Sequence, residues 1–77
     1  MLGHSEVAAD KYTEALQIYE KVSGRQTTSY ASTLANLGVL YRTMALRSKG
    51  MDKLQLLERS QEALADSLEI RSILLGE

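Results

Sequence analysis

The feature that most constrains the fold of this chain is an apolar stripe at helical spacing between Thr27 and Arg47. At 100° per residue, one helical face collects Tyr30, Ala31, Leu34, Leu37, Gly38, Tyr41 and Ala45. Leu40 and Met44 widen this stripe, so the helix is expected to pack against more than one neighbour. Glycine is about 1 kcal/mol less favourable than alanine inside a helix, so Gly38 on the buried face favours a close approach by another backbone. The alternative is an ordinary buried helix that tolerates one glycine.

Two further helices flank this one, and the three together predict an all-α fold. The 77 residues contain no proline and no cysteine, and they allow one small domain. Helical periodicity predicts three antiparallel helices over about residues 5–23, 27–47 and 52–75, because the connections between them are short. The expected N-caps are Ser5, Thr27 or Thr28, and Asp52, and the expected terminating glycines are Gly24, Gly50 and Gly76. Residues 1–77 are therefore interpreted as a single helical segment.

The third expected helix is apolar on two sides, although the second helix can cover only one of them. One stripe consists of Leu54, Leu57, Leu64, Leu68 and Leu75. The other stripe consists of Leu56, Ala63, Ile70 and Leu74. A helix with two apolar sides needs partners on both, so we expect the second stripe to meet a neighbour in a longer repeat array or in another copy of the chain. Self-association through this second stripe, in a structural homo-oligomeric bundle, is one hypothesis for what the chain does.

An internal repeat relates the first and third helices. The segment Ala15-Leu16-Gln17-Ile18 precedes Gly24 at the same distance as Ser67-Leu68-Glu69-Ile70 precedes Gly76. Two similar helices on either side of a different one are the arrangement expected of a two-helix repeat.

The spacing of small, large and aromatic residues resembles that of a known helical repeat. The central helix contains Leu34-x2-Leu37-Gly38-x2-Tyr41, and the first helix carries Ala8, Tyr12 and Ala15. These signatures resemble helix A and helix B of the tetratricopeptide repeat. The segment that links the two helices, from Gly24 to Leu37, is similar to the longer repeats of kinesin light chains and nephrocystin-3-like proteins. The resemblance implies the order helix B, helix A, extended helix B, with Gly3 in the preceding turn.

The chain departs from that repeat in three places. Thr27 and Thr28 stand where the longer repeats carry His-Pro. In the second helix B, the repeat would have a small, an aromatic and a small residue where this chain has Ser60, Leu64 and Ser67. An insertion of about ten residues between Tyr41 and Ser60 lengthens the usual repeat period, so the resemblance does not predict regular stacking beyond Met44.

The resemblance also implies a binding site on the central helix. The face opposite its apolar stripe carries Ser32, Asn36, Val39, Thr43 and Arg47. In tetratricopeptide repeats this face of helix A lines a groove that accepts extended peptides, and Asn36 matches a position whose amide bonds the peptide backbone. Arg42 and Arg47 are then expected to meet acidic side chains of the ligand. The expected function is a protein-interaction module with a scaffold or adaptor role, and the alternative is a plain solvent-facing surface.

Charge and composition argue against most other functions. No acidic residue lies between Lys21 and Met51, so the central helix is locally positive between two acidic ones. His4 is the only histidine, and the carboxylate pairs on the helices have no histidine near them in the sequence. The basic residues are too sparse for nucleic-acid binding, and no apolar run is long enough to span a membrane. We therefore expect a cytoplasmic protein without enzymatic activity, metal or cofactor.

Overall fold

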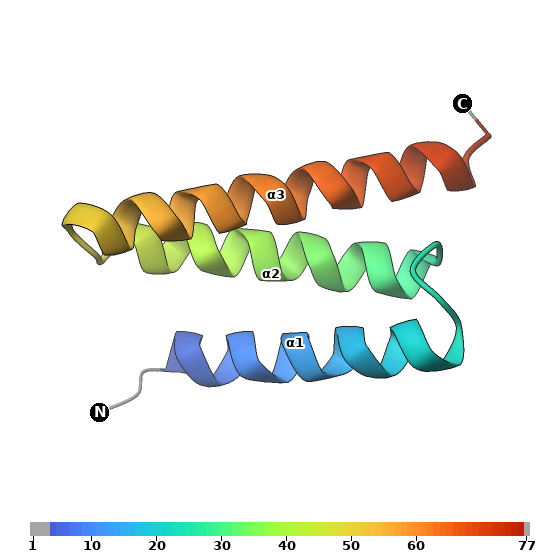
Figure 1. Cartoon of the computed structure of the whole chain (residues 1–77), viewed down its shortest axis with the longest axis horizontal. Coiled ribbons are helices and arrows are strands. Elements are labelled where there is room, and N and C mark those ends of the chain that lie inside the picture. Colours follow the sequence, from blue (N-terminus) through green and yellow to red (C-terminus); the bar gives the residue numbers. More distant parts are fainter. Residues whose placement is uncertain (1–3, 77) are drawn as a thin grey trace.

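Three α-helices form the whole of the computed structural model, which describes residues 4–76. Helix α1 spans His4–Val22, α2 spans Thr28–Leu46 and α3 spans Gly50–Leu74. Helix α2 lies between the other two and runs antiparallel to both (Figure 1). The prediction of an all-α fold with three helices is thus confirmed, while the turn expected at Gly3 lies outside the described residues.

The start of α2 follows the prediction, and the starts of the other two helices do not. Thr27 is the N-cap of α2, and its Oγ1 accepts a hydrogen bond of 3.1 Å from the Tyr30 N–H. Ser5 is not a cap, because it already lies inside α1. Asp52 is not a cap either: α3 begins two residues earlier, after Lys49, and Asp52 lies in the first helical turn. A carboxylate still stabilises a helix at that position, because it faces the positive end of the helix dipole.

Of the three glycines expected to end a helix, two follow a helix and one begins the next helix. Gly24 and Gly76 follow α1 and α3 with φ angles of +84° and +79°, as the left-handed residue after a helix requires. Gly50, which was expected to end the central helix, instead begins α3 with a φ of +63°. Helix α2 ends before it, at Leu46, and the Ser48 hydroxyl donates a 3.0 Å hydrogen bond to the Met44 carbonyl there.

Removal of the Thr27 cap has a defined expected result. Thr27→Ala should lower the free energy of unfolding by about 1 kcal/mol, because the Tyr30 N–H loses its acceptor at the helix start. Urea denaturation followed by circular dichroism measures this change. Thr28→Ala is the matched control, since Thr28 is exposed and is not the cap; an equal loss in both variants would contradict the assignment of the cap.

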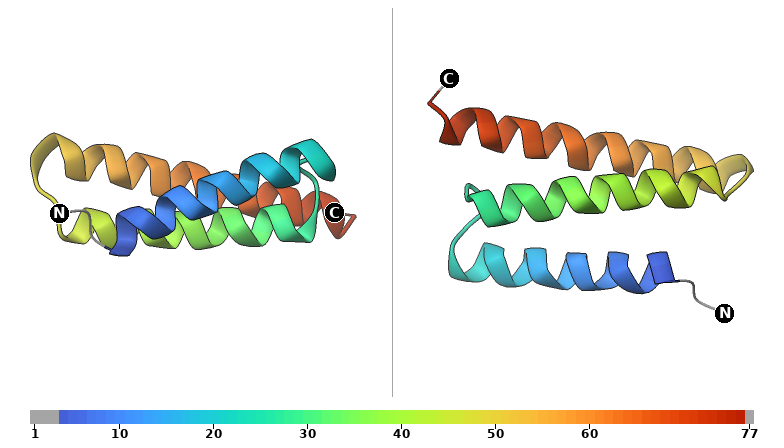
Figure 2. Two further views of the ribbon diagram at one scale, coloured as in Figure 1. Left: turned by 90° about the horizontal axis from the view of Figure 1, so that it is seen from below. Right: turned by 180° about the vertical axis from the view of Figure 1, so that it is seen from behind.

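The three helices form a thin, nearly flat layer rather than a closed bundle. The Cα atoms extend over 39 × 24 × 14 Å, and no Cα of α1 lies within 8 Å of one in α3. A width of 24 Å matches three helices side by side at the usual interaxial distance of about 9 Å. Helix α1 lies obliquely across α2 (Figure 2). Among residues 4–76, no element covers either broad face of the layer.

Small residues set seven positions apart bring α2 and α3 together. Helix α2 contributes Ala31 and Gly38 to the interface, and Ser67 and Ser60 of α3 lie opposite them. Each serine hydroxyl donates a 2.8 Å hydrogen bond to the carbonyl of its small partner, Ser67 to Ala31 and Ser60 to Gly38. These four residues are buried, and their small size allows the two backbones to approach closely.

Gly38 is the tightest point of this interface. A Cβ atom added there would lie 3.2 Å from the Ser60 carbonyl oxygen and 2.7 Å from Leu64 Cγ. The expectation that another backbone approaches at Gly38 is therefore confirmed, and the alternative of a merely tolerated glycine is wrong.

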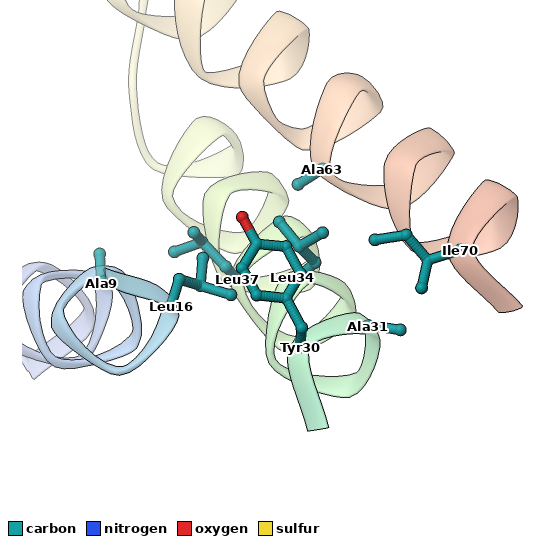
Figure 3. Close-up of a cluster of buried hydrophobic side chains, with 8 residues drawn as sticks. All are labelled: Ala9, Leu16, Tyr30, Ala31, Leu34, Leu37, Ala63 and Ile70. Atoms are coloured by element: carbon teal, nitrogen blue, oxygen red, sulfur yellow. The ribbon is translucent and has the colours of Figure 1, made fainter. Parts of the chain in front are cut away.

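The core lies where α2 meets both neighbours (Figure 3). Its buried members are Ala9 and Leu16 from α1, Tyr30, Ala31, Leu34 and Leu37 from α2, and Ala63 and Ile70 from α3. Two of the half-buried residues around it are Tyr12 and Tyr41, and the Arg59 guanidinium lies 6.0 Å from the centre of the Tyr41 ring. Helix α2 thus supplies the largest share of the core, as its long apolar stripe predicts.

The side of α3 that faces the core is not the one that the sequence predicts. Ala63 and Ile70, expected to be free for self-association, are buried against α2. Their stripe is split, since Leu56 is half-buried and Leu74 is exposed. The other stripe is the open one. The cause is the pair of serines: α3 turns Ser60 and Ser67 toward α2, which rotates the leucines between and beyond them to one side.

Candidate protein-binding surface

The polar face of α2 is open along most of its length. Asn36, Val39, Thr43 and Arg47 are exposed, and Ser32 is half-buried. These five residues lie about 180° around the helix from the core stripe, so the same periodicity that buries Leu34 exposes them. Arg42 is exposed as well, but it lies about 100° away from this row, on the side of α2 that borders α3.

A shallow hollow lies beside this row, between α2 and α1. It is lined by Ala8, Tyr12, Asn36, Val39, Leu40 and Thr43, and its volume is about 270 Å³. Helix α1 adds the Tyr12 ring and a small side chain, and α2 adds the Asn36 amide among aliphatic groups. The Thr43 hydroxyl donates within its own helix, to the Val39 carbonyl at 3.1 Å. The Asn36 amide is thus the group in this hollow that offers both a donor and an acceptor from an exposed side chain.

A larger hollow of about 500 Å³ opens at the end of the layer where α2 stops and α1 and α3 begin. Its lining residues are Ser5, Glu6, Met44, Arg47, Ser48, Asp52, Gln55, Leu56 and Arg59. Two carboxylates and two guanidinium groups are mixed in it with two apolar side chains. The helical periodicity of the sequence does not predict this hollow, because its residues come from three helices. The antiparallel order could have indicated it, since that order places both helix starts beside the end of α2.

A smaller hollow of about 210 Å³ lies at the opposite end of the layer. It is lined by Arg25, Gln26, Asp66, Glu69, Ile70 and Ile73. The Arg25 guanidinium lies 5.5 Å from the centre of the Tyr30 ring. Tyr30 raises the pKa of Arg25 above its already high ordinary value, and Glu20 and Asp66 act in the same direction. This arginine is therefore positively charged at every physiological pH.

Among residues 4–76, no group of three or more histidine and carboxylate side chains is placed to hold a metal ion. None of the three helices, within their described bounds, has the length and apolar character needed to cross a membrane. Of the expected binding residues, Asn36, Val39 and Thr43 line the hollow between α1 and α2, and Arg47 lines the larger one.

Comparison of the chain with protein-family models, with curated proteins and with solved structures gave no match.

Proposed function

We propose that the chain is a protein-interaction module of the tetratricopeptide type, which binds a peptide segment of a partner along the exposed face of α2. The single observation that carries this proposal is the hollow between α1 and α2, which is lined by Tyr12 of α1 and by the exposed Asn36 of α2. The antiparallel packing of α2 against both flanking helices agrees with the repeat that the sequence resembles.

The chemistry of the surface defines the ligand. An extended peptide has unpaired backbone N–H and C=O groups, and the Asn36 carboxamide can pair with one of each. The Tyr12 ring and the aliphatic groups of Val39 and Leu40 offer apolar contact to a side chain of that peptide. Arg47 lies at the end of the row and favours an acidic residue in the ligand.

Peptide selection followed by substitution tests the proposal. A phage-displayed library of random linear peptides is panned on the immobilised protein, and one enriched peptide is synthesised with a fluorophore for anisotropy titration. Asn36→Ala should weaken its binding about tenfold, because the hydrogen bonds of the amide contribute roughly 1.4 kcal/mol.

The matched control is Gln17→Ala, which removes an exposed carboxamide from α1. It should leave the affinity unchanged. The proposed site would be contradicted if no peptide were enriched. It would also be contradicted if the selected peptide bound Asn36→Ala as tightly as it binds the unmodified chain.

A further inference from the structure

Five leucines form an exposed apolar surface on one side of the α2–α3 pair. We call this surface the leucine face; it consists of Leu46, Leu54, Leu57, Leu64 and Leu68. Leu46, Leu54 and Leu68 are 72 %, 57 % and 69 % exposed, and the other two are half-buried. In two antiparallel right-handed helices, residues rotated in the same sense from the contact line lie on the same side. Leu46 is rotated by about 80° from Gly38, and the α3 leucines by about 40–120° from Ser60, in that same sense.

Exposed cations flank the leucine face. Arg42 lies about 40° from Leu46 around α2, and Lys53 and Arg71 lie about 60° from the middle of the leucine row around α3. All three of these side chains are exposed. The leucine face is thus apolar at its centre and basic at its edge along α2.

The carboxylates of α3 lie mostly on its other sides. Glu58 lies about 80° from the middle of the leucine row. The other four lie about 100–160° from it; they are Asp52, Glu62, Asp66 and Glu69. The charges of α3 are therefore segregated, and the leucine face has a net positive charge that is complementary to an anionic partner.

The leucines of α3 form a row along the helix rather than the wall of a recess. Leu54 and Leu68 are 14 residues apart, which is about 21 Å. None of the three hollows described above is lined by a leucine of this face. A protein partner gains most of its affinity from side chains that fill well-packed pockets, whereas lipids rearrange around side chains that project from a helix. The shape of this surface therefore favours a bilayer.

The internal repeat shows how the leucine face differs from a side that packs against a helix. Residues 52 positions apart are equivalent in the repeat, so Ala9 and Tyr19 of α1 correspond to Gln61 and Arg71 of α3. Ala9 is buried and Tyr19 is half-buried, because that side of α1 packs against α2. Gln61 and Arg71 are exposed polar side chains. A packed helix would remove both from water, whereas the headgroup region of a bilayer leaves them hydrated.

We propose that the leucine face docks on the surface of an anionic lipid bilayer. Helix α3 lies in the plane of the interface, with its leucines at the boundary between headgroups and acyl chains. The flanking cations contact anionic headgroups, and the carboxylates on the other sides of α3 remain in water. The contact uses neither Asn36 nor Tyr12, so the proposed peptide site and this docking can fail independently.

Cosedimentation of the whole chain with lipid vesicles tests the proposal. The vesicles consist of phosphatidylcholine with about 30 % phosphatidylserine, and the comparison vesicles consist of phosphatidylcholine alone. The chain should bind the anionic vesicles about 30-fold or more tightly than the neutral ones, because each Lys or Arg near an anionic surface strengthens binding about fivefold. Added salt should weaken this binding by screening. Asn36→Ala should bind the anionic vesicles like the unmodified chain.

Matched pairs of substitutions on α3 locate the contact. Leu68→Ser should weaken vesicle binding about tenfold, and Ile73→Ser should not, because Ile73 is exposed about 140° away from the middle of the leucine row. Arg71→Gln should weaken it about fivefold, and Arg59→Gln should not, because Arg59 is exposed on the opposite side of α3. Circular dichroism checks that all four variants keep their helices, as substitution at exposed positions allows.

Three results would overturn the proposal: no binding to the anionic vesicles at about 5 mM lipid, equal binding to anionic and neutral vesicles, or equal effects within either matched pair. A synthetic acidic amphipathic helical peptide identifies the alternative occupant. A chain that ignores the vesicles but binds this peptide, and loses that binding in Leu68→Ser, would overturn the proposal and assign the leucine face to a protein partner.

Discussion

A Gly38→Leu substitution is expected to separate α3 from α2 and to lower the free energy of unfolding by about 3 kcal/mol or more. The position has no room for a side chain, since even a Cβ atom would lie 2.7 Å from Leu64 Cγ and 3.2 Å from the Ser60 carbonyl oxygen. Separation of the two backbones would also break the hydrogen bond from the Ser60 hydroxyl to the Gly38 carbonyl. A domain of this size has a total stability on the order of 5 kcal/mol, so the variant should keep about 2 kcal/mol or less and unfold at a much lower denaturant concentration.

Gly38→Ala distinguishes this steric effect from helix propensity. Propensity alone would stabilise α2 by about 1 kcal/mol, whereas the contact with the Ser60 backbone should reverse the sign and leave a net loss of about 1 kcal/mol. Urea denaturation of dilute protein measures the difference. In a Leu64→Ala background the Gly38→Ala change should become less unfavourable, because the nearer obstacle is gone. A Gly38→Ala variant more stable than the unmodified chain would show that the two helices are not held at this distance.

Leu34→Ala is expected to have an effect of similar size, about 3 kcal/mol, for a different reason. Leu34 is 7 % exposed and belongs to the cluster that joins α1, α2 and α3, so its truncation leaves a cavity in the shared core. The same substitution at Leu75, which is 76 % exposed, should change the stability by less than about 0.5 kcal/mol. Thermal and urea denaturation of both variants measure this contrast. Equal effects at the two positions would contradict the core described here.

The central helix could be predicted from the sequence because a single signal determines it. Its apolar stripe, its threonine cap and its buried glycine all agree, and each has the expected place in the structure. The side of α3 that faces the core could not be predicted, because two serines occupy the centre of that interface. A hydroxyl that bonds to a backbone carbonyl behaves as a small interface residue, although a pattern based on hydrophobicity counts it as a surface residue.

The candidate site was partly predictable for the same reason. The exposed row on α2 follows from the helical period once the apolar stripe is known. The contribution of Tyr12 and Ala8 to the adjacent hollow depends on how α1 lies across α2, which no local pattern specifies. The larger hollow near Arg59 depends on three helices and on their order in space.

The absence of contact between α1 and α3 has a consequence for how the molecule opens. Each outer helix is held by α2 alone, and the α2–α3 interface is the more extensive of the two. Helix α1 can therefore detach without breaking any α2–α3 backbone contact, so the chain behaves as a linear series of neighbours rather than as one cooperative unit. Detachment of α1 would uncover Tyr30 and Leu37 and so expose a transient apolar surface on α2. The α1–α2 interface, the less extensive of the two, sets the lifetime of that surface.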